Sequence, residues 1–513
     1  MYDTYSAGML TSETGLSHTM LKKTCLSLTP EKVFLLLGIT YGILFLFVVP
    51  PFVVPDEPNH FYRAYQMSEG RFVAEKRLPA VLNPDQRAER QRDAREMRSL
   101  FMKAEVEAVM KKFYSLKDIG GIGGLLPESL LSTTNAFLRL LHPQNTQDPR
   151  DMLLLLTLPL DKNKRTFLHF PNTAVYSPVP YLPQAFGIAI GRISGLSPLA
   201  LMYLGRISNF LAWLLLMYLS IKCMPIGKWA LFLLSLSPVT LCEATSLSAD
   251  GFTVGIAFLT TSLFVRTAFD GSETRAKVSL IFAASLVLAL SKQAYFLMPL
   301  LFLLIPLEKI GSWKRYLVTF LLLIILSFSV VMIWTWKADI HEDIYTIYGF
   351  LLPDLSAKKQ MSFILKQPLE YCRILSKTFM QNGGTYMKSF IGSESELLAV
   401  CYFVMLLLAM RSEASERIVI SLKQRIVIFA VLCLNVLVVV TLAYIGWTSV
   451  GNETISGVQG RYFIPLSPLL AILLYRRKGF FPVNRTLLGL TAAVFSACSL
   501  SLTLYAVLKR FYV

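Results

Sequence analysis

Two adjacent carboxylates, Asp56 and Glu57, are the groups in this chain whose type and setting point most directly to chemistry. They follow an apolar run and lie between Pro55 and Pro58. Proline fixes φ and biases the residue before it towards extended geometry, so we expect the acids in a stiff turn. Paired acids at a membrane surface are costly unless they are solvated or used. The turn is therefore either a solvated helix stop or part of a site.

Other ionisable residues recur beside apolar runs far along the chain. Asp250 lies between two such runs, Lys292 interrupts another, and Arg461 precedes a later one. Polar groups that converge on one membrane face from distant segments predict a site for a charged ligand whose apolar tail stays in lipid. The candidate binding residues are His60, Arg63, Asp250, Lys292, Gln459, Arg461 and Tyr462.

Composition assigns the chain to the membrane proteins. Of its 513 residues, 54% are hydrophobic and only 16% are charged, whereas about 25% charged residues is typical of soluble domains. The net charge of +17 is attributed to loops that set topology and meet anionic lipid, and no nucleic-acid-binding motif is present. The seven cysteines are scattered without a Cys-x-x-Cys pair, which predicts neither a disulfide framework nor a zinc site.

The apolar runs predict an all-α polytopic membrane protein with about eleven transmembrane helices. Residues 1–31 are expected to be a cytoplasmic tail, and 182–196 a re-entrant helix, because a full crossing there would place five basic loops outside, against the positive-inside rule. Those loops are Lys222–Lys228, Arg266–Lys277, Glu308–Arg315, Arg411–Arg425 and Arg476–Arg485. The predicted spans are 32–54, 199–221, 229–246, 251–267, 278–291, 294–308, 316–336, 395–411, 426–447, 462–475 and 486–508.

Two long loops are expected on the extracytoplasmic side, at 55–175 and 337–394. In the first, residues 84–113 are rich in charge and show helical spacing of apolar residues, which predicts an amphipathic helix at the lipid headgroups or a solvated one. Residues 119–124 are glycine-rich but lack the Lys-Ser/Thr of a phosphate loop, so we interpret them as a hinge.

Four blocks carry a family resemblance. They are Pro55–Gln66 (PDEPNHFYRAYQ), Ser237–Asp250, Leu290–Lys292 and Gly457–Pro465 (GVQGRYFIP). Together they resemble a bacterial family of multispanning membrane proteins that has no settled function and is similar to the GT-C glycosyltransferases. The resemblance implies a GT-C-like helical bundle, a first extracytoplasmic loop with an acidic motif at its start and amphipathic helices, and a polyprenyl-linked sugar donor. It does not identify the sugar.

The chemistry of such a transfer can be argued separately. Moving a sugar from a lipid phosphate needs a base for the acceptor hydroxyl and positive charge for the leaving phosphate. An inverting displacement needs a single carboxylate as base. Asp56 is the expected base. Glu57 is either a helper or a ligand of a divalent ion such as Mg²⁺ or Mn²⁺, which the sequence does not require.

The expected phosphate clamp is Arg461, because its planar fork binds phosphate oxygens through two donors. Lys292 is expected to supply a second charge, and Asp250 to hold either cation or bind the acceptor. Each has a structural alternative: Arg461 pairs with Asp250 or lipid headgroups, Lys292 snorkels to the interface, and Asp250 caps a helix.

The resulting hypothesis is a cell-membrane glycosyltransferase. Its partners would be a polyprenyl-phosphate sugar donor, a glycan or lipid acceptor and membrane lipids, with no nucleic acid, and its site would face the extracytoplasmic side. Two alternatives remain: a transporter or flippase for a lipid-linked glycan, and a non-catalytic assembly partner. A flippase should carry acids and bases along a path at mid-membrane depth, whereas the apolar runs here are nearly free of charge away from one face.

Overall fold

The computed structural model describes residues 29–77, short pieces between 92 and 99, and residues 121–142, 144–269, 275–339, 354–392, 395–413, 418–476 and 485–513. Its first half contains α2 (Pro30–Val48), α3 (Glu57–Ser68), β1 (Glu75–Arg77), β2 (Gly121–Pro127), α6 (Glu128–Leu138), η1 (Arg139–Leu141), α7 (Pro149–Thr157), β3 (Arg165–His169), α8 (Pro171–Ala174), η2 (Val179–Tyr181), α9 (Leu182–Ile193), α10 (Pro198–Cys223), α11 (Lys228–Ser235) and α12 (Pro238–Ala244). The second half contains α13 (Ala249–Phe269), α14 (Arg275–Ser291), η3 (Gln293–Tyr295), η4 (Met298–Leu304), α15 (Leu307–Ile310), α16 (Trp313–Ala338), α18 (Ala357–Lys366), α19 (Pro368–Ile391), α20 (Glu396–Ser412), α21 (Leu422–Trp447), η5 (Gly460–Leu466), α22 (Ser467–Leu474) and α23 (Arg485–Phe511).

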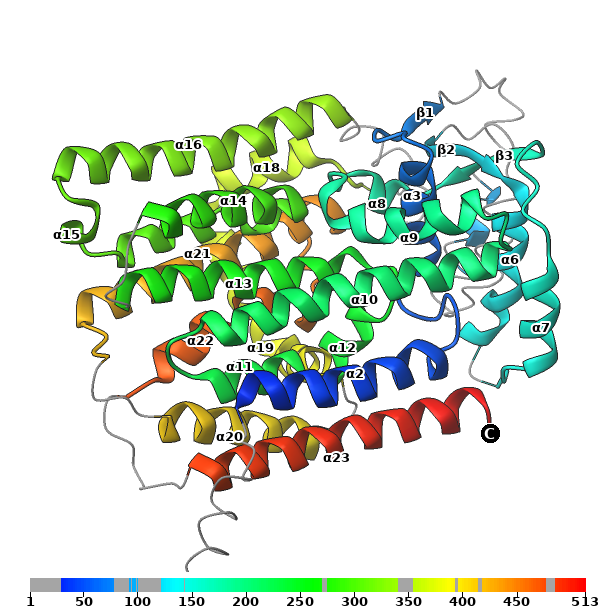
Figure 1. Cartoon of the computed structure of the whole chain (residues 1–513). Helices are drawn as coiled ribbons and strands as arrows, with labels where there is room; N and C mark the ends of the chain where they lie inside the picture. Colours follow the sequence, from blue (N-terminus) through cyan, green and yellow to red (C-terminus); the bar gives the residue numbers. More distant parts are fainter. Residues whose placement is uncertain are drawn as a thin grey trace, which may run out of the picture.

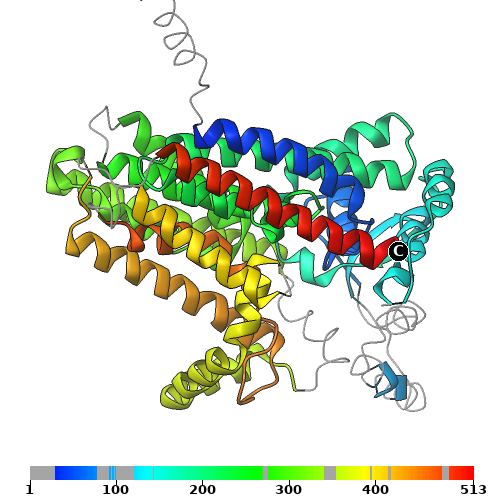
Figure 2. The ribbon, with the colours of Figure 1, turned by 90° about the horizontal axis from the view of Figure 1, so that it is seen from below.

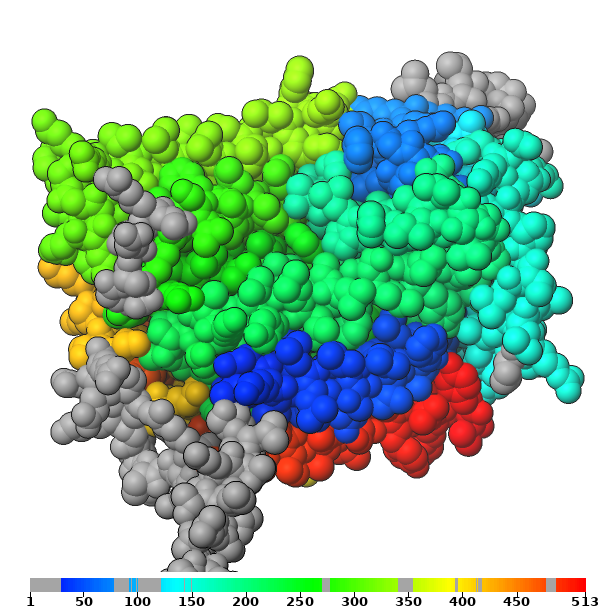
Figure 3. Space-filling model, in the orientation of Figure 1, coloured from blue at the N-terminus to red at the C-terminus, as the bar shows by residue number. Residues whose placement is uncertain are grey.

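The long helices run side by side along one axis (Figure 1). Viewed from below, α23 lies along α2 (Figure 2), and in the space-filling view the two close the lower part of the face on which α10 also lies (Figure 3). The exposed large side chains of these helices are mostly apolar; Leu36, Phe47, Leu211 and Leu215 are examples. An apolar outer surface of this kind matches a lipid environment.

Six helices within the described residues are long and apolar enough to cross a membrane: α2, α10, α13, α16, α21 and α23. A seventh crossing exists if the bent pair α19 and α20 is one span. The prediction of eleven full-length spans is therefore not confirmed. Proline interrupts three of the other predicted segments: Pro238 separates α11 from α12, Pro299 lies in the 3₁₀ helix η4, and Pro465 lies in η5. Proline lacks the N–H donor that a continuous helix needs. The remaining two, 278–291 and 395–411, form α14 and α20 of 17 residues each.

The two ends of the bundle differ. In Figure 1, α2 starts at the left, and the helices that flank the five predicted basic loops also begin or end there. The sheet, α3, α6 to α9 and the C-terminus lie at the opposite end. Residues 182–196 form α9 and its following turn; α9 has 12 residues and a length of about 18 Å. That length is too short to cross a hydrocarbon core of about 30 Å.

A small antiparallel sheet of order β1-β2-β3 adds strand structure to the predicted all-α fold. The predicted glycine hinge is wrong in its described part, since Gly121–Gly124 begin the central strand β2. Glycine is needed at Gly123, where a Cβ would overlap the carbonyl oxygen of Leu168 on β3. The predicted helix at 84–113 falls mostly outside the described residues. In the second predicted loop, the described residues form α18 and α19.

Candidate functional site

A cavity of about 290 Å³ lies where α3, the α14–η3 junction, α13, α21 and η5 meet. Six of the predicted site residues line this charged cavity: Asp56, His60, Asp250, Lys292, Arg461 and Tyr462. One wall is apolar and comes from the end of α21, including Val439, Leu442 and Trp447. The residues that line the cavity come from segments between Asp56 and Tyr462, and the fold brings these segments to one place.

Asp56 is the N-cap of α3 and adopts a left-handed backbone, with φ 61° and ψ 5°. Aspartate tolerates this conformation better than most residues because its short side chain can bond locally. The side chain is exposed to the cavity, yet nearby atoms replace part of its water shell. This desolvation raises the pKa of the Asp56 carboxyl above its ordinary 3.8, while Arg461 opposes and Asp250 adds to the shift. Asp56 is thus a carboxylate with enhanced basicity at the mouth of the cavity.

Two ion pairs face Asp56 across the cavity. Lys292 Nζ lies 2.8 Å from Asp250 Oδ1, and Arg461 Nη1 lies 2.5 Å from Glu243 Oε1. Arg461 Nε is 3.9 Å from Asp250 Oδ2, so the pairs form one cluster. All four side chains are less than a fifth exposed. Buried charges of this kind need partners, which explains why each cation has a carboxylate beside it.

Both cations retain donors that protein groups do not fill. Arg461 Nε is buried without a hydrogen-bond partner among the described residues. Lys292 donates to Asp250, and its ammonium group otherwise lies over the ring of Tyr462, 4.4 Å from the centroid. An ammonium has three donors and a guanidinium five. The two cations therefore keep donors beyond those that their ion pairs use.

Charge is balanced among the groups that line the cavity. Asp56 and Asp250 oppose Lys292 and Arg461, and His60 is neutral because burial lowers its pKa to about 3. Its Nδ1 lies 2.7 Å from the hydroxyl of Tyr181. Attraction for an anion therefore comes from directed donors rather than from excess positive charge.

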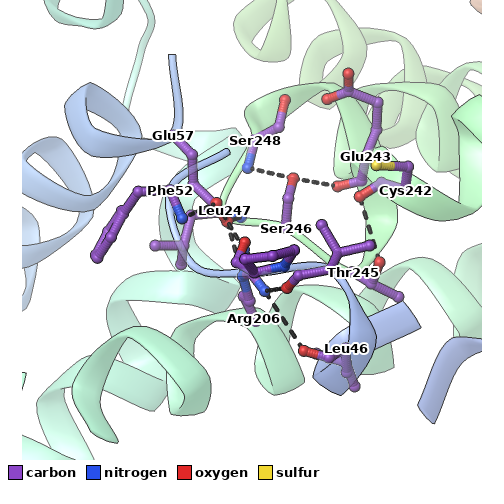
Figure 4. Close-up of polar contacts among 12 residues, drawn as sticks. Leu46, Phe52, Glu57, Arg206, Cys242, Glu243, Thr245, Ser246, Leu247 and Ser248 are labelled. Atoms are coloured by element: carbon purple, nitrogen blue, oxygen red, sulfur yellow. Dashed lines mark hydrogen bonds and ion pairs between the residues drawn. The ribbon is translucent and has the colours of Figure 1, made fainter. Parts of the chain in front are cut away.

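Glu57 is placed differently from its predicted role beside Asp56. It is fully buried and turned away from the cavity, and its two oxygens accept from Arg206 Nε at 2.8 Å and Nη2 at 2.6 Å (Figure 4). The backbone N–H groups of Phe52 and Leu247 also donate to it. With its acceptor sites occupied, Glu57 fixes the turn and is not available to bind a metal ion there.

Arg206 completes this arrangement from α10. Besides Glu57, its guanidinium donates to the carbonyl oxygens of Leu46, Val49 and Pro50, which end α2. We call Glu57, Arg206 and these backbone partners the corner latch. It joins the end of α2, the start of α3, α10 and the turn between α12 and α13, and so holds the backbone on which Asp56 stands.

Arg63 and Gln459 do not line the cavity. Arg63 is buried inside the α3 corner and donates to Gln66 Oε1 at 2.6 Å and to the Phe72 carbonyl at 2.7 Å. Gln459 is the N-cap residue that precedes η5, without a side-chain cap bond. The predicted substrate contacts of these two residues stay predictions, since neither side chain lines the cavity.

The comparison with known proteins fits a membrane location. A family model described as "Predicted membrane protein (DUF2142)" matches residues 39–470. The chain belongs to this DUF2142 family. The matched range contains every residue of the charged cavity and the corner latch. No curated protein and no solved structure matches the chain.

Sequence reasoning missed one charged member of the site in this DUF2142 chain. Glu243 falls within the predicted span 229–246; in the structure it lies in the last turn of α12 and pairs with Arg461. The available signal was a lone acid within the predicted span 229–246, which is costly in a membrane unless paired. Among the described residues, no group of three or more His, Cys, Asp or Glu side chains could hold a metal ion.

Proposed function

We propose that this protein transfers a sugar from a polyprenyl-phosphate-type lipid to an acceptor on the extracytoplasmic side of the cell membrane. The observation that carries the proposal is one cavity that combines an accessible carboxylate of raised pKa, Asp56, with partly unfilled donors on Arg461 and Lys292. A base and an anion clamp are the two groups that displacement from a lipid phosphate needs. The resemblance to GT-C enzymes supports the same chemistry.

In the proposed step, Asp56 takes the proton of an acceptor hydroxyl. The acceptor oxygen forms a bond to the anomeric carbon, and the bond from that carbon to the phosphate oxygen breaks with its electron pair on the phosphate. Arg461 and Lys292 stabilise the charge that develops on the leaving phosphate. One displacement inverts the anomeric configuration and needs no covalent enzyme intermediate. The apolar α21 wall would border the lipid part of the donor.

Asp56→Asn tests the base. In proteoliposomes with a labelled polyprenyl-phosphate sugar, we expect a loss of transfer of about 100-fold or more, the usual range for a general base. Binding of the donor should become tighter, because one negative charge that faces the cavity is removed. Asp161→Asn is the matched control, since Asp161 is exposed on a remote turn.

Each outcome separates the hypotheses. Unchanged transfer by Asp56→Asn would remove Asp56 as the base, and weaker donor binding would instead make it a binding group. If the purified protein moves the lipid across the liposome membrane in the absence of any acceptor, the flippase alternative replaces the transferase. The N-terminal end of the bundle, with its basic loops, is placed in the cytoplasm in this proposal.

A further inference from the structure

We propose that a second, apolar groove holds the hydrocarbon chain of the lipid whose phosphate occupies the charged cavity. The inference rests on the proposed function and names the part of the substrate that the charged cavity cannot hold. The groove has a volume of about 570 Å³, roughly twice that of the charged cavity. Its walls come from α19, α21 and the η5–α22 segment and include Phe379, Gly383, Leu437, Val440 and Phe463.

The groove is chemically suited to a chain and not to a headgroup. Almost all of its surface is carbon, and no charged residue lines it. The hydroxyl of Ser467, one of the few polar groups in the lining, is used within the protein, since it donates to the Ile464 carbonyl at 2.6 Å. A phosphate placed there would lose its water without gaining donors. A hydrocarbon chain has no hydrogen bonds to water to lose, and it gains contacts with the walls.

The groove is open on the side where lipid would lie. Leu437 and Leu470, which line it, are 41% and 44% exposed, and Phe379 is 38% exposed. Leu437 belongs to α21, one of the six long apolar helices. Large apolar side chains exposed along such a helix face hydrocarbon in a membrane. A chain can therefore enter from the bilayer without crossing water.

The groove adjoins the charged cavity, which indicates that both bind parts of the same lipid molecule. Tyr462 lines the cavity and the next residue, Phe463, lines the groove; on α21, Val439 lines the cavity and Val440 the groove. Arg461 and Phe463 are two residues apart, which limits their Cα separation to roughly 7–8 Å. A lipid with its phosphate at Arg461 can thus place the first part of its chain beside Phe463. A groove that only binds ordinary membrane lipids would have no reason to lie next to the charged cavity.

Two neighbouring glycines of α19 provide a sharp test. Gly383 lines the groove and Gly384 does not, and an added Cβ at either position meets no atom within 4 Å. Gly383→Leu should fill part of the groove, whereas Gly384→Leu adds the same side chain outside it. Both changes replace glycine in a helix by a better helix former, so folding should survive. The melting temperature of each full-length variant in detergent checks this.

The measurement is the binding of prenyl monophosphates of increasing length: geranyl, geranylgeranyl and undecaprenyl phosphate. Wild type and Gly384→Leu should bind more tightly as the chain lengthens. Gly383→Leu should bind geranyl phosphate as wild type does and the long chains about tenfold to a hundredfold more weakly, which corresponds to lost contact for two or three CH₂ groups. Undecaprenol, which lacks the phosphate, should bind more weakly than undecaprenyl phosphate in every variant.

Equal chain-length dependence in wild type and Gly383→Leu would overturn the proposal. So would equal binding of undecaprenol and undecaprenyl phosphate, because the groove would then be a general lipid site unconnected to the charged cavity. Binding requires no turnover. If the glycine variants bind the lipids as expected but no sugar is transferred, the groove proposal is supported and the transferase proposal fails. If sugar is transferred but Gly383→Leu binds every lipid as wild type does, the transferase proposal is supported and the groove proposal fails.

Discussion

At the scale of residues, two neighbouring acids have opposite surroundings. Asp56 is exposed to the charged cavity, whereas Glu57 is fully buried against Arg206. The left-handed backbone at Asp56 separates them, because it turns the chain between one side chain and the next. A backbone of this kind persists only where neighbouring groups hold it. The corner latch supplies such groups at Glu57, the residue next to Asp56.

The raised pKa of Asp56 predicts a pH dependence. A base must be ionised, so transfer should fall as pH decreases through a pKa that lies above 3.8. His60, with a pKa of about 3, titrates below that range and should not set this limb. The rate of transfer against pH, measured for wild type and His60→Gln, checks the assignment. If the acidic limb of the pH–rate profile shifts in His60→Gln, the assignment of that limb to Asp56 is wrong.

The same shift makes a stability prediction for Asp56→Asn. A carboxyl whose pKa is raised in the folded state stabilises the fold below 3.8, and this contribution is lost as pH rises through the raised pKa. Near neutral pH, Asp56→Asn should therefore melt at the same temperature as wild type or higher, and this advantage should disappear in acid. A lower melting temperature for the variant at neutral pH would show that ionised Asp56 is structural.

The corner latch predicts a large and partly reversible loss of stability. Arg206→Met leaves Glu57 buried and unpaired, which should cost about 3–5 kcal/mol. Adding Glu57→Gln removes that charge and should recover part of the loss. Lys164→Met is the control, since its pair with Glu128 is 70% and 42% exposed and worth less than about 1 kcal/mol. Denaturant unfolding in detergent is measured for five proteins: wild type, Arg206→Met, Glu57→Gln, the double variant and Lys164→Met. Additive losses in the double variant would mean that the two side chains are not coupled.

Much of the site could be predicted at this scale. Asp56, Asp250, Lys292 and Arg461 were found because charge beside apolar runs is costly and therefore informative. The sequence could not separate Asp56 from Glu57, since adjacent acids look equivalent until a distant partner is known. That partner, Arg206, lies 149 residues further along the chain. The same limit hid the pairing of Glu243 with Arg461.

At the scale of elements, Gly460 explains how η5 presents Arg461. Its N–H donates to Ser389 Oγ at 2.7 Å, and a Cβ would overlap the Tyr386 carbonyl oxygen of α19. Gly460→Ala should force η5 away from α19, cost about 1–3 kcal/mol and weaken binding of the phosphate lipid. Gly384→Ala, where a Cβ meets no atom within 4 Å, should be neutral or gain up to about 1 kcal/mol. Equal effects of the two variants on melting and binding would contradict this role.

Elements were predicted well where one physical signal dominates. Hydropathy located the six long apolar helices, because about 20 apolar residues are needed to cross the bilayer. Hydropathy predicted helices that are too long around Pro238, Pro299 and Pro465. There the apolar sequence continues, but the helix is interrupted or becomes a 3₁₀ helix. The strand β2 was missed because its glycines serve a close approach to β3, a tertiary requirement with no local signal.

At the scale of the whole molecule, the bundle has a charged-cavity end and an end with basic loops. Figure 1 shows α2 starting and α23 ending at opposite ends. The end of α23 is tied to the cavity end, since Arg510 donates to the carbonyls of Leu140 and Asn145 and the Phe511 carbonyl accepts from Gln147. In the orientation that we propose from the positive-inside rule, the basic end lies in the cytoplasm. The N- and C-termini of this chain should then lie on opposite sides of the membrane.

Reporter fusions test that orientation in a bacterial host. Val513 is 93% exposed, so a fusion after it should leave α23 in place. Alkaline phosphatase, which is active only outside the cytoplasm, should be active when fused after Val513 and inactive when fused before Met1. A fluorescent protein that matures only in the cytoplasm should give the opposite pattern at the two positions. If the C-terminal fluorescent fusion glows, the cavity end faces the cytoplasm, and the donor and acceptor would have to be sought on that side.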